Sequence, residues 1–246
     1  MGKLINKVAL VTGGSRGMGA AIALRLAKEG AHVAITYKNS AAKADAVVKE
    51  IEQLDRGGLA IAADSADPHQ VSSAVDEVVN KFGRIDILVN NAGIFEVRPL
   101  DAITLDDYQK TLDTNVRAVV FASQAAAKHM TTGGRIISIG SNLAERTPMG
   151  GVSLYSLSKA ALIGFTKGIA RDLGPRGITA NVVHPGSTDT DMNPADGPYS
   201  DGQRSAMCIP RYAKPDDIAG LVAWLASEDA RCMTGAGLTI DGGTNA

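Results

Sequence analysis

The stretch from Val8 to Gly19 constrains the fold of this chain more than any other. It opens with four β-branched or apolar residues, which is the length and composition of a buried strand. Glycines follow, and a helical stripe of Met18, Ile22 and Leu26 begins among them. Glycine lets the backbone approach an anion closely, and a helix N-terminus presents free N–H groups to it. The stretch therefore predicts a phosphate-binding turn between a strand and a helix.

Two other structures fit the same glycines, whose Gly-x-x-x-Gly-x-Gly spacing differs from the common dinucleotide fingerprint and from a P-loop. The segment Gly13–Gly17 matches the Gly-x-Ser-x-Gly nucleophile turn of α/β-hydrolases. Too little chain precedes it, however, for the strands and the oxyanion loop that such an enzyme needs. The second alternative is a glycine turn that binds no ligand.

Composition restricts the class of protein. The 246 residues are 45% apolar and 21% charged, with a formal net charge of −1. We expect one cytoplasmic domain over residues 1–246 and no nucleic-acid partner, because Lys and Arg do not cluster. Neither a membrane span nor a signal peptide is expected from the apolar runs. Cys208 and Cys232 lack metal or redox spacing, so no metal site is expected.

Strand-like and helix-like segments alternate along the chain, which predicts an α/β, Rossmann-like, doubly wound parallel sheet with helices on both faces. The seven expected strands are Val8–Val11, His32–Tyr37, Leu59–Ala63, Ile85–Asn90, Arg135–Gly140, Ile178–Val183 and Gly237–Ile240. The helices expected after the first are Ala41–Leu54, Pro68–Phe82, Thr104–Met130, Ser153–Leu173 and Pro215–Ala226. The patternless segment 187–211 follows the sixth strand, and we interpret it as a substrate lid.

The residues after the second strand bear on the choice of dinucleotide. NAD-binding sheets carry an acidic residue there for the ribose hydroxyls, whereas this chain has Tyr37, Lys38, Asn39 and Ser40. Arg16 adds a cation within the glycine turn, and a guanidinium binds phosphate through charge-assisted hydrogen bonds. We therefore predict NADP(H). The alternative is that Lys38 and Arg16 are ordinary surface charges.

A tyrosine and a lysine supply the candidate chemistry. Tyr155 and Lys159 are four residues apart, on one face of a predicted helix. A phenol with a pKa of about 10 is a poor acid at neutral pH, and a nearby ammonium lowers that pKa. Ser141 follows the strand Arg135–Gly140 at the same edge of the sheet, where its hydroxyl can share a substrate oxygen with Tyr155. A tyrosine and a lysine at this spacing can also be two ordinary solvent-exposed residues on a helix surface.

Together these motifs resemble the short-chain dehydrogenase/reductase superfamily in its single-domain form, from about Lys7 to Gly243. The resemblance rests on matching segments in the family order, which are Thr12–Gly19, Asn90–Gly93, Asn115, Ser141, Tyr155 with Lys159, and Pro185–Gly186 followed by Thr190. It implies an NADPH-dependent oxidoreductase that reduces a ketone or aldehyde to an alcohol, reversibly. It also implies a homotetramer or homodimer formed through Thr104–Met130, Ser153–Leu173 and the final strand.

The resemblance also implies roles for individual residues. Tyr155 donates a proton to the carbonyl oxygen as hydride arrives, and Ser141 stabilises that oxygen. Lys159 binds the nicotinamide ribose and lowers the pKa of Tyr155, while Asn115 holds a water that links Lys159 to solvent. Asp64 is implied to meet the adenine. The implied cofactor-binding residues are Gly13, Ser15, Arg16, Gly17, Met18, Gly19, Tyr37, Lys38, Asn39, Ser40, Asp64, Asn91, Ala92, Gly93, Tyr155, Lys159, Pro185, Gly186, Thr188 and Thr190.

Two positions depart from the family pattern. Ser141 lies at the long end of the usual spacing before Tyr155, and Asn142 is one residue closer. We prefer Ser141 because it directly follows Gly140 and the strand. Thr188 stands where a branched apolar residue is common.

The substrate is less constrained than the cofactor. Within the superfamily the chain resembles 3-oxoacyl-[acyl-carrier-protein] reductases and related bacterial carbonyl reductases. Arg176 fits a basic docking residue for an acidic carrier protein, but Thr132 stands where a second is expected. Three functions therefore remain: a reductase of small carbonyl compounds, a carrier-protein reductase, and a nucleotide-binding sensor with little turnover. The segment Asn193–Met207 is expected to decide the substrate.

Overall fold

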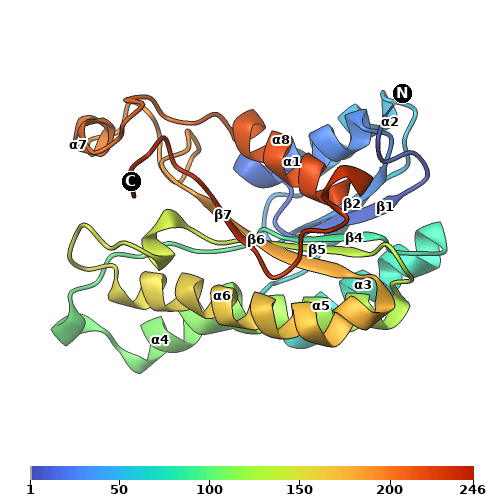
Figure 1. Cartoon of the computed structure of the whole chain (residues 1–246), viewed down its shortest axis with the longest axis horizontal. Helices are drawn as coiled ribbons and strands as arrows, with labels where there is room; N and C mark the ends of the chain where they lie inside the picture. The colour runs from blue at the N-terminus through green and yellow to red at the C-terminus, as the bar shows by residue number, and fades with distance from the viewer. Residues whose placement is uncertain (1) are drawn as a thin grey trace.

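The apolar runs predicted as strands assemble into one parallel sheet. The computed structural model describes residues 2–246, and its strands pair in the order β3-β2-β1-β4-β5-β6-β7 (Figure 1). Their bounds are β1 Val8–Val11, β2 His32–Tyr37, β3 Gly58–Ala62, β4 Ile87–Asn90, β5 Arg135–Ile139, β6 Thr179–Pro185 and β7 Gly237–Ile240. The predicted Rossmann-like sheet of seven parallel strands is confirmed.

The strand order reverses between β1 and β4. The chain runs outward from β1 through β2 to β3, returns to the centre at β4, and then runs outward the other way to β7. Ligands bind at such a switch point because the connections leave the carboxyl ends of the two central strands in opposite directions. The glycine turn after β1 and Asn91 after β4 both lie there.

Helices cover both faces of the sheet, as predicted. Helices α1, α2 and α8 lie on one face, and α3, α5 and α6 lie on the other (Figure 1). The helix bounds are α1 Gly17–Lys28, α2 Ala41–Glu52, α3 Pro68–Phe82, α4 Leu105–Leu112, α5 Ala118–His129, α6 Ser153–Leu173, α7 Ser200–Ser205 and α8 Pro215–Ala226. Within residues 2–246, no helix combines the length and apolarity needed to cross a membrane.

Strand β1 illustrates why its residues form an unbroken apolar run. Ala9 and Val11 pack into the core beneath α1 and α8, whereas Val8 and Leu10 pack into the core beneath α3 and α5. Successive side chains of a strand point to opposite faces, and both faces of this sheet are covered. Alternation of apolar and polar residues is therefore absent from the central strands.

The single helix predicted over Thr104–Met130 is wrong in one respect. The structure has α4, then a π-helical turn over Asp113–Arg117, and then α5. Asn115 lies in the π turn and is completely buried, where its amide bonds both backbone groups of Ile94 and the hydroxyl of Ser158. A side chain held in this way accounts for the local departure from α-helical geometry.

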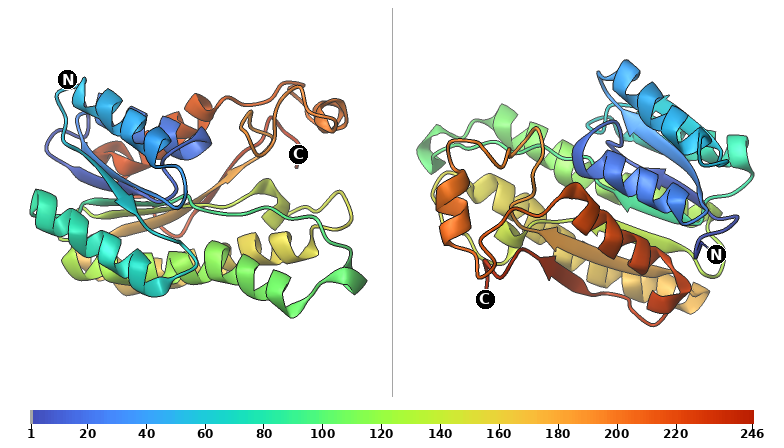
Figure 2. Two further views of the ribbon diagram at one scale, coloured as in Figure 1. Left: turned by 180° about the vertical axis from the view of Figure 1, so that it is seen from behind. Right: turned by 90° about the horizontal axis from the view of Figure 1, so that it is seen from above.

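The predicted lid segment 187–211 stands above the carboxyl edge of the sheet (Figure 2). It contains α7, a short helix that its Gly- and Pro-rich pattern did not predict. Gln203 organises the segment, because its Oε1 accepts hydrogen bonds from Asn193 at 3.0 Å, from Tyr212 at 2.9 Å and from Ser187. The guanidinium of Arg204 lies 5.1 Å from the centre of the Tyr212 ring. The segment is thus cross-linked by polar side chains.

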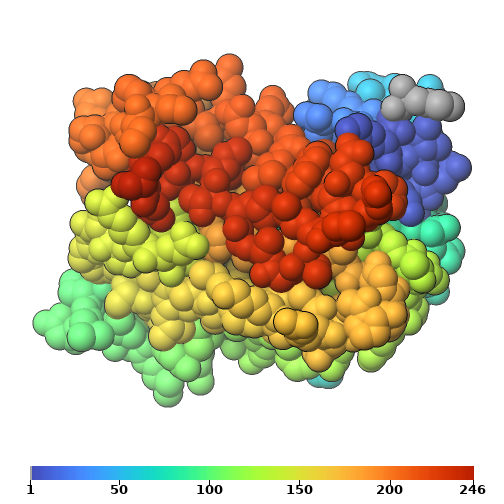
Figure 3. Space-filling model, viewed as in Figure 1, coloured from blue at the N-terminus to red at the C-terminus, as the bar shows by residue number. Residues whose placement is uncertain are grey.

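The C-terminal residues close one side of this edge. Asn245 donates to the carbonyl of Asn142 at 2.8 Å, and Arg146 donates to the carbonyl of Thr244. Figure 3 shows the red C-terminal tail lying against the yellow-green segment that follows β5. The tail therefore supports the turn that contains Ser141.

Candidate active site

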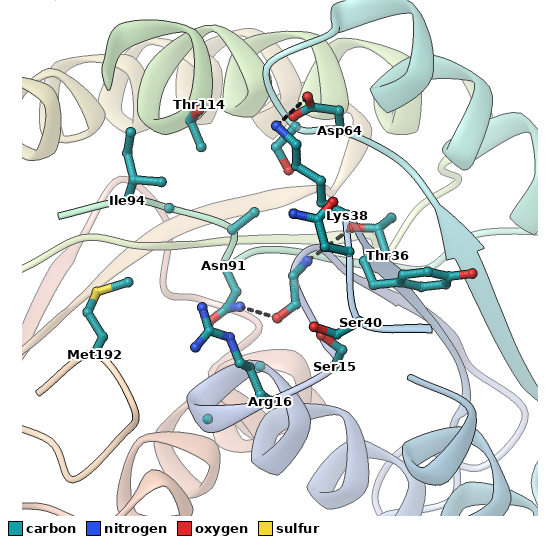
Figure 4. Close-up of a pocket in the computed structure, with 18 of the residues that line it drawn as sticks. Ser15, Arg16, Thr36, Lys38, Ser40, Asp64, Asn91, Ile94, Thr114 and Met192 are labelled. Carbon is teal, nitrogen blue, oxygen red and sulfur yellow. Dashed lines mark hydrogen bonds and ion pairs between the residues drawn. The ribbon is translucent and has the colours of Figure 1, made fainter. Parts of the chain in front are cut away.

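A cavity of about 430 Å³ opens at the switch point of the sheet (Figure 4). The predicted cofactor residues that line it are Gly13, Ser15, Arg16, Gly17, Met18, Gly19, Tyr37, Lys38, Asn39, Ser40, Asp64, Asn91, Ala92, Gly93 and Thr190. Lining residues that sequence reasoning missed are Thr36, Ala63, Ser65, Ala66, Ile94, Lys110, Thr114, Asp191 and Met192. In Figure 4, Ile94 and Met192 lie at the end of the cavity opposite Ser40.

The glycine turn forms a close-fitting backbone cradle. Gly13 and Gly17 have positive φ angles of 64° and 54°, which side-chain-bearing residues rarely adopt. A Cβ on Gly19 would lie 2.3 Å from the carbonyl oxygen of Gly13 and 2.5 Å from Nδ2 of Asn91. That Asn91 amide holds the turn by donating to the carbonyls of Thr12 at 2.9 Å and Gly13 at 3.1 Å. Larger residues at these positions would fill the cradle.

The turn leads directly into the N-terminus of α1. Arg16 occupies the N-cap position but contributes no side-chain cap, so its side chain does not satisfy the first N–H groups of the helix. The turn is held from behind by Thr36 of β2, whose Oγ1 accepts from the backbone N–H of Gly13 at 3.0 Å. An exposed helix N-terminus beside a glycine cradle is suited to a phosphate.

The cations predicted for a 2′-phosphate lie at this cavity, and each is paired with a carboxylate. Nζ of Lys38 lies 2.7 Å from Asp64, the residue that we expected at the adenine. The guanidinium of Arg16 lies 3.3 Å from Asp191, which also attracts Lys43 at 3.6 Å. Arg16 and Lys43 hold the pKa of Asp191 below its usual range. Together with Lys110, these Arg16, Lys38, Asp64 and Asp191 side chains give the cavity wall five charged groups, of which three are positive.

The candidate catalytic residues meet beyond the glycine turn. Lys159 is buried in α6, and its Nζ donates to the carbonyl of Ile139 at 2.8 Å. A Cβ on Gly93 would lie 3.3 Å from Oδ1 of Asn115 and 3.4 Å from Nζ of Lys159. The backbone after β4 therefore passes close to both side chains, and a Cβ there would make a tight contact with each of them. Tyr155 and Lys159 lie outside the lining of the cavity described above.

The pKa of Tyr155 differs from the sequence expectation. Burial raises it to about 12, although a hydrogen bond with the Ser141 side chain acts in the opposite direction. The Phe95 ring packs edge-on against the phenol at 4.8 Å and contributes to that burial. Lys159 does not lower this pKa in the structure, because its ammonium faces the Ile139 carbonyl and lies 5.8 Å from the centre of the tyrosine ring. Tyr155 is thus a neutral phenol at ordinary pH.

Burial acts on Lys159 in the other sense. It lowers the pKa of this lysine to about 8, because the charged form is the one that loses hydration. The ammonium still predominates at neutral pH. The site therefore holds a protonated phenol and a cation whose charge is lost just above neutrality.

Ser141 and Asn142 are both buried after β5. Oγ of Ser141 accepts from the backbone N–H of Leu143 at 3.1 Å and bonds to Tyr155. The contact from the C-terminal tail reaches the carbonyl of Asn142 instead. Of the two candidates, Ser141 is the one whose side chain meets Tyr155.

The residues predicted at the end of β6 separate into two groups. Thr190 lines the cavity and faces the glycine turn, since a Cβ on Gly17 would lie 3.5 Å from its methyl group. Pro185, Gly186 and Thr188 lie outside the cavity lining. Thr188 is buried, and its hydroxyl donates to the carbonyl of Gly186 at 3.1 Å.

Comparisons with known proteins agree with this architecture. A family model described as enoyl-(acyl carrier protein) reductase matches residues 13–245. The cyclic-di-GMP-binding biofilm dispersal mediator protein of Escherichia coli K12 is 46% identical over 242 residues, covering 98% of each chain.

Two solved structures superpose closely on this chain. A short chain dehydrogenase from Burkholderia cenocepacia J2315 in complex with NADP has a TM-score of 0.98 and 64% identity, with 99% of this chain and 100% of that chain covered. A blue fluorescent protein from a metagenomic library in complex with NADPH has a TM-score of 0.98 and 56% identity, with coverage of 99% and 100%. The chain belongs to the short-chain dehydrogenase/reductase superfamily of oxidoreductases.

Proposed function

We propose that this protein reduces a ketone or aldehyde with NADPH as the hydride donor. The observation that carries the proposal is a glycine cradle and a cation-bearing wall combined with a group of three residues beyond the glycine turn: Tyr155, its partner Ser141, and the buried Lys159. A phosphate-binding turn alone is compatible with many functions. A phenol hydrogen-bonded to a serine, with a buried lysine on the same helix, is suited to proton transfer and is not needed for binding alone.

The residues present fit NADP(H). The absence of a Cβ on Gly19 lets the start of α1 pack directly against the Gly13 carbonyl, which keeps the helix N-terminus close to the turn as a pyrophosphate site requires. Arg16 and Lys38 bring positive charge to the cavity, and Lys43 lies behind them beside Asp191, as a 2′-phosphate requires. Two similar structures contain NADP or NADPH, which supports the same choice here. When bound, NADPH supplies a hydride from C4 of its nicotinamide.

The protein groups then manage the proton and the charge on the substrate oxygen. Tyr155 is protonated at neutral pH and donates that proton to the carbonyl oxygen as the carbon is reduced. The Ser141 hydroxyl, already bonded to Tyr155, stabilises the charge developing on the same oxygen. The Ser141 hydrogen bond is the contact that lowers the pKa of Tyr155 and so favours the phenolate left after transfer, while the Lys159 ammonium faces the Ile139 carbonyl. Asn115 fixes the backbone of Ile94 between the two regions.

A substrate panel tests the proposal. Diverse ketones and aldehydes are mixed with NADPH, and oxidation of the cofactor is followed by its absorbance. We expect turnover of at least one compound, its loss in Tyr155→Phe, and nearly unchanged NADPH binding by that variant in a fluorescence titration. Full activity of Tyr155→Phe would refute the mechanism.

A nucleotide-binding sensor is the second candidate. The E. coli relative, 46% identical, is named for binding cyclic di-GMP. A cyclic dinucleotide carries phosphates and purines, and a glycine turn with nearby cations suits both features. Calorimetric titration with cyclic di-GMP, with and without NADPH, separates the candidates. Tight binding that NADPH blocks, in a protein without turnover, would favour the sensor.

A carrier-protein reductase remains as a third candidate because the matching family model is described in those terms. The basic residue predicted for docking is used within the fold. Arg176 donates to the carbonyls of Ala127 and Met130, each at 2.7 Å, at the end of α5. We therefore expect a small ketone and its carrier-linked equivalent to be reduced with similar kcat/KM. A strong preference for the carrier-linked form would support the third candidate.

We further propose that copies of the chain associate through α5 and α6. A groove of about 360 Å³ runs between these helices. It is lined by Val120, Ser123, Gln124, Ala127, Lys128, Phe165, Ile169, Asp172, Leu173 and Arg176. A partly apolar groove on paired helices suits a second copy of the same surface. Light scattering coupled to gel filtration should give the mass of a tetramer or dimer.

A further inference from the structure

His184 is a buried imidazole that the proposed reaction does not use. It lies in β6, next to the end of β5, and none of its surface is exposed. Its Nδ1 is 3.0 Å from the carbonyl oxygen of Ser141 and 3.3 Å from the backbone nitrogen of the same residue. The ring therefore contacts the backbone on both sides of the Cα of Ser141, the serine beside Tyr155.

The contacts assign a tautomer. Nδ1 can either donate to the Ser141 carbonyl at 3.0 Å or accept from the Ser141 N–H at 3.3 Å. We assign the proton to Nδ1 because the carbonyl contact is the shorter, which leaves Nε2 as an acceptor. Nε2 is buried, and no partner for it exists among residues 2–246. A buried acceptor without a partner is tolerated more readily than a buried N–H donor. Burial lowers the pKa of His184, which keeps the ring neutral.

Two glycines hold the ring in place. A Cβ on Gly140 would lie 2.5 Å from Nδ1, and a Cβ on Gly237 would lie 3.1 Å from Nε2. The imidazole therefore fills a slot between the end of β5 and the start of β7. Any side chain at either glycine would displace it.

The hydrogen bond ties the serine turn to the sheet. The Ser141 carbonyl also accepts from Ala144 at 3.0 Å, but Ala144 belongs to the same turn and moves with it. His184 is anchored in β6, so its bond fixes the turn relative to the strands. The direction of the Ser141 side chain depends on the orientation of this peptide.

We propose that His184 is a positioning residue, which holds the Ser141 peptide so that the serine hydroxyl stays directed at Tyr155. This inference rests on the proposed reductase function for its kinetic consequence. The hydrogen bond itself does not depend on that function. His184 does not contact the reacting atoms and takes no part in proton transfer.

A matched pair of variants tests the kinetic consequence. Asn and Leu have nearly the same shape, but only Asn offers an N–H donor at the place of Nδ1. We expect His184→Leu to lower kcat by at least about ten-fold, since misplacement by about 1 Å can cost up to ~100-fold. KM and the NADPH Kd should change by less than about two-fold. His184→Asn should recover most of kcat, and equal losses in both variants would overturn the proposal.

A double-mutant cycle separates positioning from general damage. If His184 acts through the serine hydroxyl, His184→Leu should have little further effect once Ser141→Ala has removed that hydroxyl. Losses that multiply in the double variant would show that His184 acts elsewhere. Circular dichroism and thermal unfolding confirm that each variant is folded.

The imidazole ¹⁵N spectrum of the wild-type protein provides a test independent of turnover and of any variant's folding. One of the four histidines should show the Nδ1–H tautomer without titrating between about pH 5 and 8, and its signal should vanish in His184→Asn. An Nε2–H tautomer, or a titrating ring, would overturn the inference. A wild-type protein without turnover on any carbonyl would refute the proposed function, and this spectrum would still decide whether His184 holds the Ser141 peptide.

Discussion

Adding one methyl group at Gly19 should disable the phosphate cradle. The new Cβ would lie 2.3 Å from the Gly13 carbonyl oxygen, about 1 Å closer than carbon and oxygen normally approach. Either the turn or the first turn of α1 must move by that amount. Loss of one charge-assisted hydrogen bond to the pyrophosphate costs about 1.5–3 kcal/mol. That corresponds to NADPH binding weakened by about 10- to 150-fold.

Gly220→Ala is the matched control for this change. Gly220 lies inside α8, and a Cβ there would meet only the flexible end of Arg25, at 3.7 Å. Replacing a helical glycine by alanine stabilises by about 0.5–1 kcal/mol. The melting temperature should therefore rise by about 1–4 °C for a chain of this size, with NADPH binding unchanged.

Fluorescence titration with NADPH and thermal unfolding measure both variants. Gly19→Ala should bind weakly and melt below the wild type, because overpacking typically costs about 1–3 kcal/mol. If Gly19→Ala bound NADPH with wild-type affinity, the glycine turn would not be the phosphate site. The assignment of the cavity would then fail with it.

Three further predictions concern other parts of the site. Arg16→Ala and Lys38→Ala should each raise the Kd for NADPH by roughly ten-fold, while leaving that for NADH nearly unchanged; equal weakening of both would place the 2′-phosphate elsewhere. The pKa of Lys159 falls from 10.5 to about 8 on folding. Between about pH 8 and 10.5 the unfolded chain therefore binds more protons at this lysine than the folded chain does. Over this pH range the contribution of Lys159 to the free energy of unfolding should rise with pH. Lys159→Met should abolish that rise in urea titrations, and an unchanged slope would contradict the burial argument. Asn115→Leu leaves the N–H and C=O of Ile94 without their buried partners and should cost about 2–5 kcal/mol of stability, whereas a loss below about 0.5 kcal/mol would show that the π turn does not depend on these bonds.

The sheet could be predicted closely because burial on both faces leaves a clear sequence pattern. The largest difference is at β6, which continues to Pro185 although the pattern indicated an end at Val183. Pro185 has no N–H to donate, but β5 ends at Ile139, opposite Val183, so only β7 borders this last part of the strand. A proline is tolerated where one side of a strand lies open. Whether this side of β6 is open depends on where β5 ends, and the residues around Pro185 carry no information about that.

The polar details of the site depended on long-range contacts. Lys38 and Arg16 were predicted as phosphate ligands, but their carboxylate partners Asp64 and Asp191 follow other strands of the sheet. The raised pKa of Tyr155 depends on burial of its phenol, and no motif indicated that burial. The spacing of the motifs along the sequence predicted which residues lie near one another. It did not predict how deeply each side chain is buried or which carboxylates pair with the cations.

The π turn at Asp113–Arg117 has a consequence for how this segment tolerates length changes. Its wider winding takes up roughly one residue more than an α-helix would over the same rise. Because the surplus residue is absorbed within the π turn, deleting one residue there should restore regular winding and leave α4 and α5 nearly in their present phase. Deleting a residue from the regular winding of α4 or α5 would instead rotate the flanking residues by about 100° relative to one another. The π turn is therefore the place where this segment can lose a residue without changing the sides that its two helices present to the rest of the fold.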